Sequence, residues 1–316
     1  MISAMRLASI VCGLAVAILV APAACADWRD EISVLRVGVM AGDNSPYRMI
    51  QFESFRLYLE SRLAITVEIV PVENYTALID AHVTSRVDYA IYSATAFSTA
   101  ALSCDCVEPL VLPTGANGET GFHALLITRA DSRIKSLADA KGTRLALAGP
   151  DSIGGRMMQL EEFEQEGINP QTYFARVFET ENPELAISML LAGEADLSVA
   201  WSSMAGDASV GYSFGILARM VALEELSMDQ IRIVWQSPLI PFGPHAVRSD
   251  LPDDLTRLLS HALVAMAFES PEALDAVDRS GGRGMVVADR AMYAPIEALI
   301  SLERETGEGS GSVSPR

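Results

Sequence analysis

The sequence predicts an α/β fold with mainly parallel sheets, arranged as two lobes. Beyond residue 27, apolar segments with the character of buried strands alternate with segments of helical spacing, which is typical of parallel strands joined by helices. About 290 residues follow a predicted leader at 1–26, more than one hydrophobic core ordinarily holds. A polar segment at 129–135 interrupts the alternation and separates two groups of elements.

The first group of predicted elements alternates strand and helix. Apolar residues recur at helical spacing in its first helix, and its last helix opens with Ser and Thr residues suited to capping. In order, we expect a strand at Val34–Met40, a helix at Ile50–Leu63, a strand at Ile65–Pro71, a helix at Tyr75–Arg86, a strand at Tyr89–Tyr92 and a helix at Thr95–Leu102.

The second group begins with an apolar strand at Phe122–Thr128 that leads into the polar segment. It continues with a strand at Leu145–Ala148, a helix after Gly155, a strand around Phe174–Phe178, a helix at Pro183–Ala192 and a strand at Asp196–Ala200. The rest of the chain is expected to hold a strand at Ile231–Trp235, an extended segment with three prolines at Ser237–Val247, and helices at Leu251–Ala267 and Ala291–Leu302. A Gly- and Ser-rich tail at 304–316 is expected to be disordered.

The amino-terminal segment predicts export by a cleavable signal peptide at 1–26. Arg6 precedes a continuous apolar run at Leu7–Ala21, and Ala24-Cys25-Ala26 forms an A-x-A cleavage site. The apolar run is short for a membrane span, and no later segment is long and apolar enough to form one. We therefore expect a soluble periplasmic protein that begins near Asp27.

The cysteines leave two questions open. Lipid anchoring at Cys25 is the less favoured alternative to cleavage, because Pro22 stands where a lipobox normally has Leu. After cleavage only Cys104 and Cys106 remain. In an oxidising compartment these two can pair with each other, link to another chain or stay free.

The charge of the chain argues against nucleic acid as a partner. The mature chain would carry 22 basic residues, since Arg6 leaves with the signal, against 41 acidic ones, for a net charge of −19. Phosphate backbones are bound by basic faces, which this composition lacks. A local helix terminus can still hold an anion, because distant surface charge is screened.

A strand, a small-residue turn and a helix follow one another at Thr143–Gln165, and this corner is suited to an anion. The first turn of a helix has unpaired backbone N–H groups and a partial positive charge, and glycines let a ligand approach them. The alternative is that Asp151 or Ser152 only caps the helix and that the glycines serve a tight turn.

The order of these segments resembles the PhnD-like family of phosphate, phosphite and phosphonate solute-binding proteins of ABC transporters, over roughly residues 35–302. The motifs that carry the resemblance are Leu35-Arg36-Val37-Gly38-Val39, Asn74-Tyr75, Arg86-Val87-Asp88-Tyr89-Ala90, Asp139-Ala140-Lys141-Gly142, Leu191-Ala192-Gly193-Glu194-Ala195-Asp196, Ser237-Pro238-Leu239-Ile240-Pro241 and Arg248-Ser249-Asp250-Leu251-Pro252.

The resemblance implies a type II periplasmic binding protein fold, in which two lobes joined by two crossing segments close on a ligand. The crossings would lie near Leu126–Asp131 and Gln236–Gly243. Lobe 1 would then comprise 27–128 and 240–303, and lobe 2 would comprise 129–239. Loops at the carboxyl ends of parallel strands would line the cleft.

Within this frame, Ser152-Ile153-Gly154-Gly155 matches the family's Ser-Thr-Ser-Gly anion loop. Ile153 and Gly154 replace two hydroxyl residues, so anion binding would use the Ser152 hydroxyl and backbone N–H groups, with fewer donors. The corner therefore indicates binding at a helix start and does not identify phosphonate as the ligand.

Other candidate ligand-binding residues lie in loops that would face the cleft, and each also has an ordinary structural interpretation. Tyr47 and Tyr92 would offer aromatic rings with a hydroxyl, Ser93 and Thr95 would add donors at a second helix start, and His123 would donate from the strand at the first crossing. Glu184 matches a family carboxylate that faces an amino group of the ligand, and Trp201 would form a wall. The same residues can equally pack, cap helices or interact with a helix dipole.

We therefore expect an exported solute-binding protein that captures a small oxyanion, phosphonate-like or a related phosphorus anion, for an ABC permease. It would act as a monomer without a cofactor. One alternative is a sensor that presents its closed lobes to a membrane receptor kinase, and another is a binder of a different small organic anion. A hydrolase is disfavoured, because Pro150 breaks the Gly-x-Ser-x-Gly pattern around Ser152 and no His-Glu-x-x-His segment exists.

Overall fold

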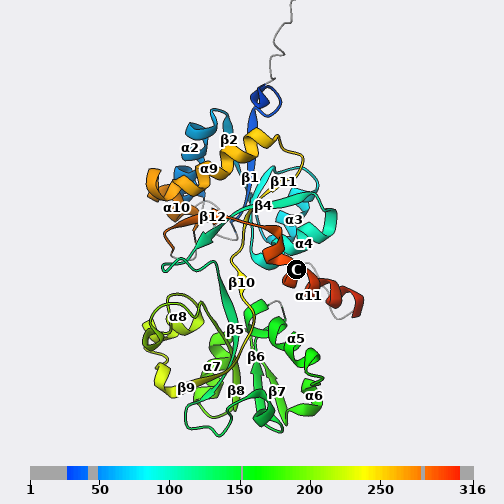
Figure 1. Ribbon diagram of the computed structural model, residues 1–316, viewed down its shortest axis with the longest axis vertical. Helices are drawn as coiled ribbons and strands as arrows, with labels where there is room; N and C mark the ends of the chain where they lie inside the picture. The colour runs from blue at the N-terminus through cyan, green and yellow to red at the C-terminus, as the bar shows by residue number, and fades with distance from the viewer. Residues whose placement is uncertain (1–26, 42–48, 151, 279–281, 307–316) are drawn as a thin grey trace, which may run out of the picture.

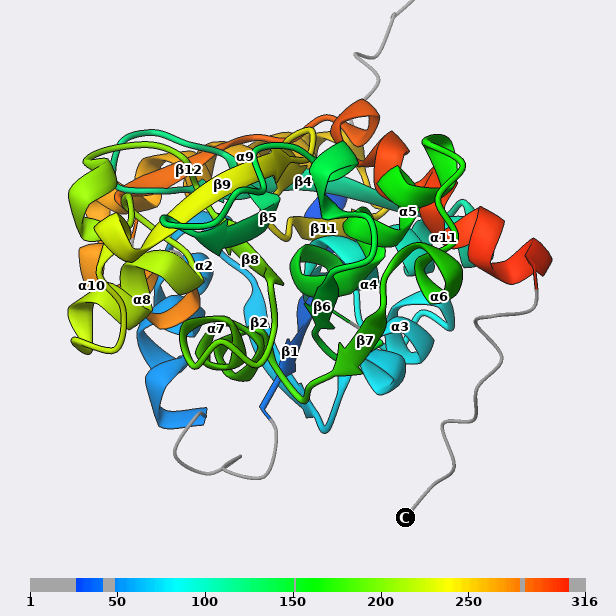
Figure 2. The same cartoon turned by 90° about the horizontal axis from the view of Figure 1, so that it is seen from below.

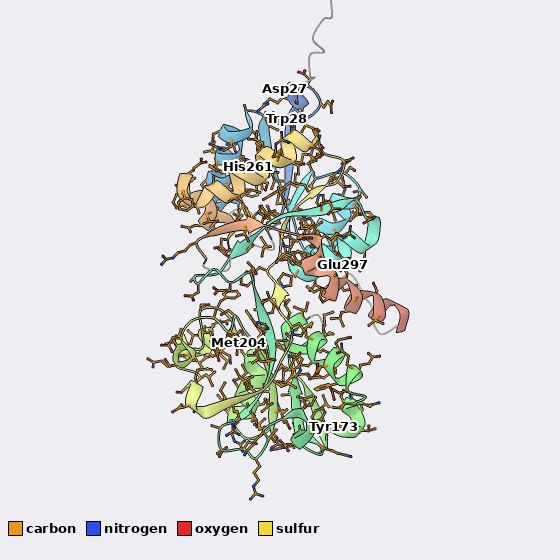
Figure 3. The ribbon with its side chains drawn as sticks, viewed as in Figure 1. Asp27, Trp28, Tyr173, Met204, His261 and Glu297 are labelled. Carbon is orange, nitrogen blue, oxygen red and sulfur yellow. A yellow bond between two sulfur atoms is a disulfide. The ribbon has the colours of Figure 1, made fainter. Side chains whose placement is uncertain are left out.

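The computed structural model describes residues 27–41, 49–150, 152–278 and 282–306, which form two α/β lobes. The lobes are stacked along the long axis of the molecule, with β5 and β10 at the centre (Figure 1). Asp27 and Trp28 lie at the far end of lobe 1, and Tyr173 lies at the opposite end of lobe 2 (Figure 3). The predicted signal peptide and the residues after Thr306 lie outside the described residues.

Lobe 1 is built around a six-stranded sheet in the order β12-β4-β11-β3-β1-β2. Its strands are β1 (Val34–Met40), β2 (Thr66–Val72), β3 (Tyr89–Ile91), β4 (Val107–Thr114), β11 (His245–Arg248) and β12 (Gly284–Val287). Its helices are η1 (Trp28–Asp30), α2 (Glu53–Leu63), α3 (Tyr75–Val83), α4 (Ala94–Cys104), α9 (Asp253–Glu269), α10 (Pro271–Val277), η7 (Arg290–Tyr293) and α11 (Ala294–Thr306).

Lobe 2 contains the second six-stranded sheet, in the order β10-β5-β8-β6-β7 with β9 paired to β5. Its strands are β5 (Gly121–Arg129), β6 (Arg144–Leu147), β7 (Arg176–Glu179), β8 (Leu197–Ser202), β9 (Ile231–Gln236) and β10 (Ile240–Pro241). Its helical segments are η3 (Leu137–Ala140), η4 (Ile153–Met157), α5 (Met158–Gln165), α6 (Pro170–Tyr173), α7 (Pro183–Leu191), η5 (Ala208–Val210), α8 (Ile216–Ala222) and η6 (Met228–Gln230).

Both sheets are mixed, so the expectation of mainly parallel sheets is wrong in this detail. The strands joined by helices run parallel: β1 pairs in parallel with β2 and β3, and β6 pairs in parallel with β7 and β8. In contrast, β11 is antiparallel to β3 and β4, and β5 is antiparallel to β8, β9 and β10. The reason is that β5 and β11 each enter a sheet from the other lobe and so run against the strands they join.

The chain passes between the lobes at 115–120, between β4 and β5, and returns at 242–244, between β10 and β11. The expected first crossing near Leu126–Asp131 is therefore wrong. Residues 121–128 and the strand β10 both pair inside the second sheet, so they belong to lobe 2 and not to lobe 1 as the sequence predicts. Leu125, Leu126 and Ile127 are fully buried there, because this part of β5 lies between β8 and β9 in the lobe 2 core.

The core of lobe 1 forms where helices cover the apolar side chains of β1. Leu35 and Val37 are fully buried against a cluster that includes Phe55 and Leu59 of α2 and Leu259 of α9. Phe52, which begins the turn into α2, belongs to the same cluster. Burial of each large apolar side chain is worth roughly 1.5–3 kcal/mol, so this layer holds the carboxyl ends of the strands in fixed positions.

A second apolar cluster joins the two lobes on the side of α4. Met157 and Met158 of lobe 2 belong to it together with Phe97 of α4 and Leu299 of α11. Figure 2 shows α11 on the same side of the molecule as α4, α5 and α6. Leu299 and Leu302 of α11 also line a pocket shared with Leu160 of α5. The carboxyl-terminal helix thus contacts both lobes. It ends at Thr306, four residues beyond the expected helix end at Leu302, so the expectation of a disordered tail from 304 is wrong for its first three residues.

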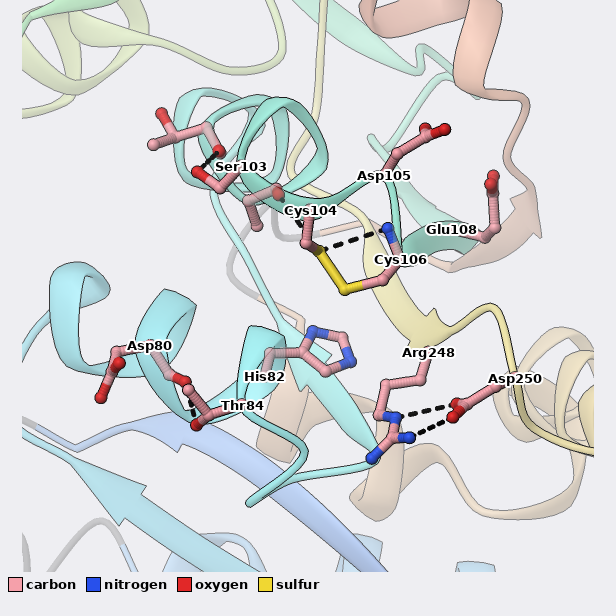
Figure 4. The surroundings of a disulfide bond; sticks show 12 residues. Asp80, His82, Thr84, Ser103, Cys104, Asp105, Cys106, Glu108, Arg248 and Asp250 are labelled. Carbon is pink, nitrogen blue, oxygen red and sulfur yellow. Dashed lines mark hydrogen bonds and ion pairs between the residues drawn. A yellow bond between two sulfur atoms is a disulfide. The ribbon is translucent and has the colours of Figure 1, made fainter.

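Cys104 and Cys106 form a disulfide with an Sγ–Sγ distance of 2.08 Å. It spans the end of α4, where Asp105 adopts a left-handed conformation with φ of 50°. The bond settles the pairing that the sequence left open. His82 and the ion pair of Arg248 with Asp250 lie in its surroundings (Figure 4). Within the described part of the chain, no helix combines the length and apolar character needed to cross a bilayer.

Candidate ligand-binding cleft

A cavity of about 150 Å³ lies at the carboxyl ends of β1 and β3, where lobe 1 meets the crossing and lobe 2. Lobe 1 supplies most of the lining, the returning crossing supplies Phe242 and Gly243, and lobe 2 supplies Phe214. In open α/β sheets this edge is where ligands bind. The lobe 1 residues are Val39, Met40, Phe52, Tyr75, Ile91, Tyr92, Pro113, His245, Ala276 and Val277.

Among the described residues, the lining of this cavity contains no Asp, Glu, Lys or Arg. Its polar side chains are Tyr75, Tyr92 and His245. Tyr92 is 4% exposed, and its hydroxyl shares a 3.1 Å hydrogen bond with Nδ1 of His82. Burial raises the pKa of Tyr92 above its ordinary value, so the phenol is neutral.

His245 is 1% exposed, and its Nδ1 is hydrogen-bonded to the hydroxyl of Tyr89. The removal of water from around the ring lowers the pKa of His245 to about 3. The imidazole is therefore neutral at physiological pH. The cavity thus offers a ligand an uncharged, mostly apolar surface.

Four aromatic side chains, which we call the aromatic wall, connect the cavity with lobe 2: Phe122, Trp201, Phe214 and Phe242. The ring centroids of Phe214 and Phe242 are 5.3 Å apart, and those of Trp201 and Phe214 are 5.5 Å apart. Phe122 completes the group, 5.1 Å from Trp201 and 6.3 Å from Phe242. Trp201 therefore lies one ring behind the cavity, at the carboxyl end of β8.

The amino terminus of α4 directly follows the cavity residue Tyr92. The hydroxyl of Ser93 accepts a 3.2 Å hydrogen bond from the N–H of Ala96 and caps the helix. The N–H groups of Ala94 and Thr95 lie in the first turn, where no carbonyl within the helix can accept from them. Ser93 and Thr95 are both half-buried. The helix start is thus positioned to present backbone donors beside the cavity.

The segment Ser152–Gly155 begins a helical turn earlier than expected. This turn is the π-helix η4, which starts at Ile153 and includes both glycines. Ser152 caps it, because its hydroxyl accepts a 3.1 Å hydrogen bond from the N–H of Gly155. A side chain at Gly154 would meet Phe122 and Trp201 at 3.1 Å, and one at Gly155 would meet Ala148 at 2.8 Å. Gly154 thus permits close packing on the aromatic wall, and Gly155 permits close packing against the end of β6.

Ile153, which replaces a hydroxyl residue of the family loop, packs against the apolar cluster that joins the lobes. The structure shows that Ser152 acts as a cap and that the glycines pack closely. A role of these four residues in anion binding stays a prediction.

Two further candidates are bonded to protein groups. Nδ1 of His123 lies 2.8 Å from the carbonyl oxygen of Ser237, which ties β5 to the returning segment. Oε1 of Glu184 lies 2.8 Å from a guanidinium nitrogen of Arg219, so its charge is compensated by α8. Tyr47 lies outside the described residues. The ligand-binding roles of all three stay predictions.

Sequence reasoning missed most of the cavity. Phe242 lies in the segment expected near the second crossing, but an apolar residue without a hydrogen-bonding group gave no signal of a ligand site. Ala276 and Val277 belong to α10, a helix that the sequence analysis does not contain. Among the described residues, no group of three or more His, Cys, Asp or Glu side chains could hold a metal ion.

Two α/β lobes meet around a cavity at the carboxyl ends of the strands, the edge of such sheets at which ligands bind. The family model described as the phosphonate periplasmic substrate-binding protein of ABC transporters matches residues 39–293. The chain belongs to this family, whose members are periplasmic substrate-binding proteins of transport systems.

Solved structures support the fold. A Xanthomonas citri protein bound to ATP is 20% identical, with a TM-score of 0.64 over 87% of this chain and 99% of that one. PhnD1 from Prochlorococcus marinus in complex with methylphosphonate is 16% identical, with a TM-score of 0.57 over 87% and 99%. A binding protein component of a Pseudomonas aeruginosa ABC phosphonate transporter is 20% identical, with a TM-score of 0.55 over 89% and 90%.

Proposed function

We propose that this protein captures a phosphonate or a related small phosphorus oxyanion between its lobes and delivers it to an ABC permease. The observation that carries the proposal is the cavity at the carboxyl ends of β1 and β3 beside the start of α4, in a chain of the phosphonate-binding family. The oxyanion would accept hydrogen bonds from the first turn of α4. Lobe 2 would close over the ligand and supply Phe122, Trp201 and Phe214 of the aromatic wall.

Binding alone accounts for this arrangement, and we propose no catalytic step. Ser152 is a helix cap, His123 is bonded to a backbone carbonyl and Glu184 is paired with Arg219, so these candidates are separately engaged. In the closed form, the protein would present both lobes to its permease, and the closed shape would signal that ligand is bound.

The anion site can be tested by a charge change that keeps the helix cap. Asp and Asn both cap helices well, so Ser93→Asp and Ser93→Asn should leave α4 stable, and only the first adds negative charge. In a thermal-shift and calorimetry panel of phosphate, phosphite, methylphosphonate, methanesulfonate and acetate, we expect a phosphorus anion to bind best. We expect Ser93→Asp to weaken that binding at least about ten-fold through repulsion, while Ser93→Asn changes it little.

The same pair of substitutions at Ser152 tests whether lobe 2 contributes backbone donors. A loss of affinity confined to Ser152→Asp would assign η4 to the site. If only sulfonates or carboxylates shift the melting temperature, the phosphorus assignment is wrong and the binding fold remains. Equal affinities of the Ser93→Asp and Ser93→Asn proteins would remove the start of α4 from the site.

We further propose that the protein is exported with cleavage before Asp27 and acts as a monomer. The A-x-A sequence at 24–26 supports the cleavage site. The intact mass of protein recovered from the periplasm should match a chain that starts at Asp27, and its size-exclusion mass should match one chain. A lipid adduct on Cys25 in the recovered protein would contradict the cleavage proposal.

A further inference from the structure

The cavity has the volume and the lining of a site for an apolar group. Val39, Ile91, Phe242 and Val277 are among its walls, and its volume is about 150 Å³. An enclosed apolar cavity of this volume in another protein holds a molecule of the size of benzene. Inorganic phosphate and phosphite carry no group that would use such a surface.

The polar side chains of the lining are engaged or uncharged, which separates the cavity from the anion site. The hydroxyl of Tyr92 is bonded to His82, and Nδ1 of His245 is bonded to Tyr89. No described cation lines the cavity to balance an oxyanion. An anion buried there would lose its hydration without a partner, so the charged end of a ligand belongs at the rim, by the α4 start.

A cationic substituent is disfavoured for the same reason. An ammonium group in the cavity would need a carboxylate, and none of the described lining residues is acidic. Glu184, the family position expected to recognise an amino end, is held 2.8 Å from Arg219. Its compensated charge is a poor partner for an ammonium group.

We propose that the ligand is a phosphonate with an apolar substituent of about the size of a butyl or phenyl group. This inference rests on the proposed function. The substituent fills the cavity between β1, β3 and α10, and the oxyanion stays at the start of α4. The site thus selects apolar organophosphonates over phosphate, phosphite and aminoalkylphosphonates. Phe214 of lobe 2 covers the substituent as the lobes close.

Calorimetry with phenylphosphonate, butylphosphonate, methylphosphonate, 2-aminoethylphosphonate and phosphate tests this selectivity. We expect phenyl- or butylphosphonate to bind at least about ten-fold more tightly than methylphosphonate, because several additional carbons leave water. We expect 2-aminoethylphosphonate to bind no more tightly than methylphosphonate.

A variant that fills the cavity locates the substituent. Ala276 is a half-buried lining residue on α10, and Ala276→Leu should remove the advantage of the larger phosphonates while methylphosphonate still binds. Retained methylphosphonate affinity also reports that the variant is folded. Ala222→Leu makes the same change at an exposed position of α8 and should leave every affinity unchanged.

The outcomes separate this inference from the proposed function. If methylphosphonate or 2-aminoethylphosphonate binds as tightly as phenyl- and butylphosphonate, the inference is overturned and the proposed function stands. If Ala276→Leu weakens all phosphonates equally, the substituent does not occupy the cavity. If no phosphonate binds, the proposed function is wrong and the inference falls with it.

Discussion

We expect acidification from pH 7 to pH 5 to destabilise lobe 1 by about 4 kcal/mol, because two buried histidines there must stay neutral. Burial lowers the pKa of His82 to about 4 and that of His245 to about 3. In the unfolded chain both histidines would have a pKa of about 6.5. Below that value the unfolded state binds more protons than the folded state, so the stability present at neutral pH is lost at about 1.4 kcal/mol per histidine and pH unit.

The carboxylates with a lowered pKa do not share this window. Carboxylates whose pKa is lowered by a hydrogen-bonded guanidinium, such as Asp196 beside Arg144, lose their contribution only at more acidic pH. The opposite charges of Arg248 and Asp250 near His82 act on its pKa in opposite directions. The interval from pH 7 to pH 5 therefore reports mainly on His82 and His245.

Urea denaturation at the two pH values, followed by circular dichroism, measures the effect. Combining His82→Gln with His245→Gln should flatten the pH dependence, whereas His261→Gln, on the exposed face of α9, should leave it unchanged (Figure 3). A wild-type change of less than about 1 kcal/mol, well under the linkage expectation, would contradict the buried neutral state.

Replacement of Gly243 by Ala should destabilise the protein by about 3 kcal/mol or more, because the crossing segment packs directly against the backbone of Tyr92 and Ser93. A Cβ atom at Gly243 would overlap the carbonyl oxygen of Tyr92 and would lie 2.7 Å from Cα of Ser93. Backbone atoms cannot rotate away as a side chain can, so one of the two segments must shift. Since Tyr92 lines the cavity and Ser93 caps α4, ligand affinity should fall together with stability.

Gly284→Ala is the matched control, because its new Cβ would meet Ala267 only at 3.7 Å. Both variants can be compared by urea denaturation and by titration with the best phosphonate. A Gly243→Ala protein as stable as the Gly284→Ala protein would show that the crossing at 242–244 does not run close against the backbone of Tyr92 and Ser93.

Much of the fold was predictable because local patterns and tertiary structure agree. The apolar run at Val34–Met40 coincides with β1, and the Asn74 cap places the start of α3 at Tyr75. Strand β4 was not predicted, since Pro109 and Pro113 lie within it and proline is disfavoured in sheet interiors. The pairing of β4 with β11 and β12 comes from distant parts of the chain.

The candidate site was less predictable, because polar character drew attention to residues that the fold uses for its own support. Ser152 and Ser93 carry hydroxyl groups that could donate to a ligand, but both hydroxyls cap helices. Phe214 and Val277 are apolar like core residues, but they line the cavity. From the sequence alone, an apolar residue that lines a cavity cannot be distinguished from one that is buried in the core of a lobe.

The insertion of β11 between β3 and β4 has a consequence for the order in which the two lobes can fold. All strands of lobe 2 lie between residues 121 and 241, so that lobe can complete its sheet without the residues that follow. Lobe 1 has to keep a gap beside β3 until His245–Arg248 arrives from the far side of lobe 2. Because Val39 and Val277 both line the cavity, the protein should bind its ligand only after α10 has packed on lobe 1.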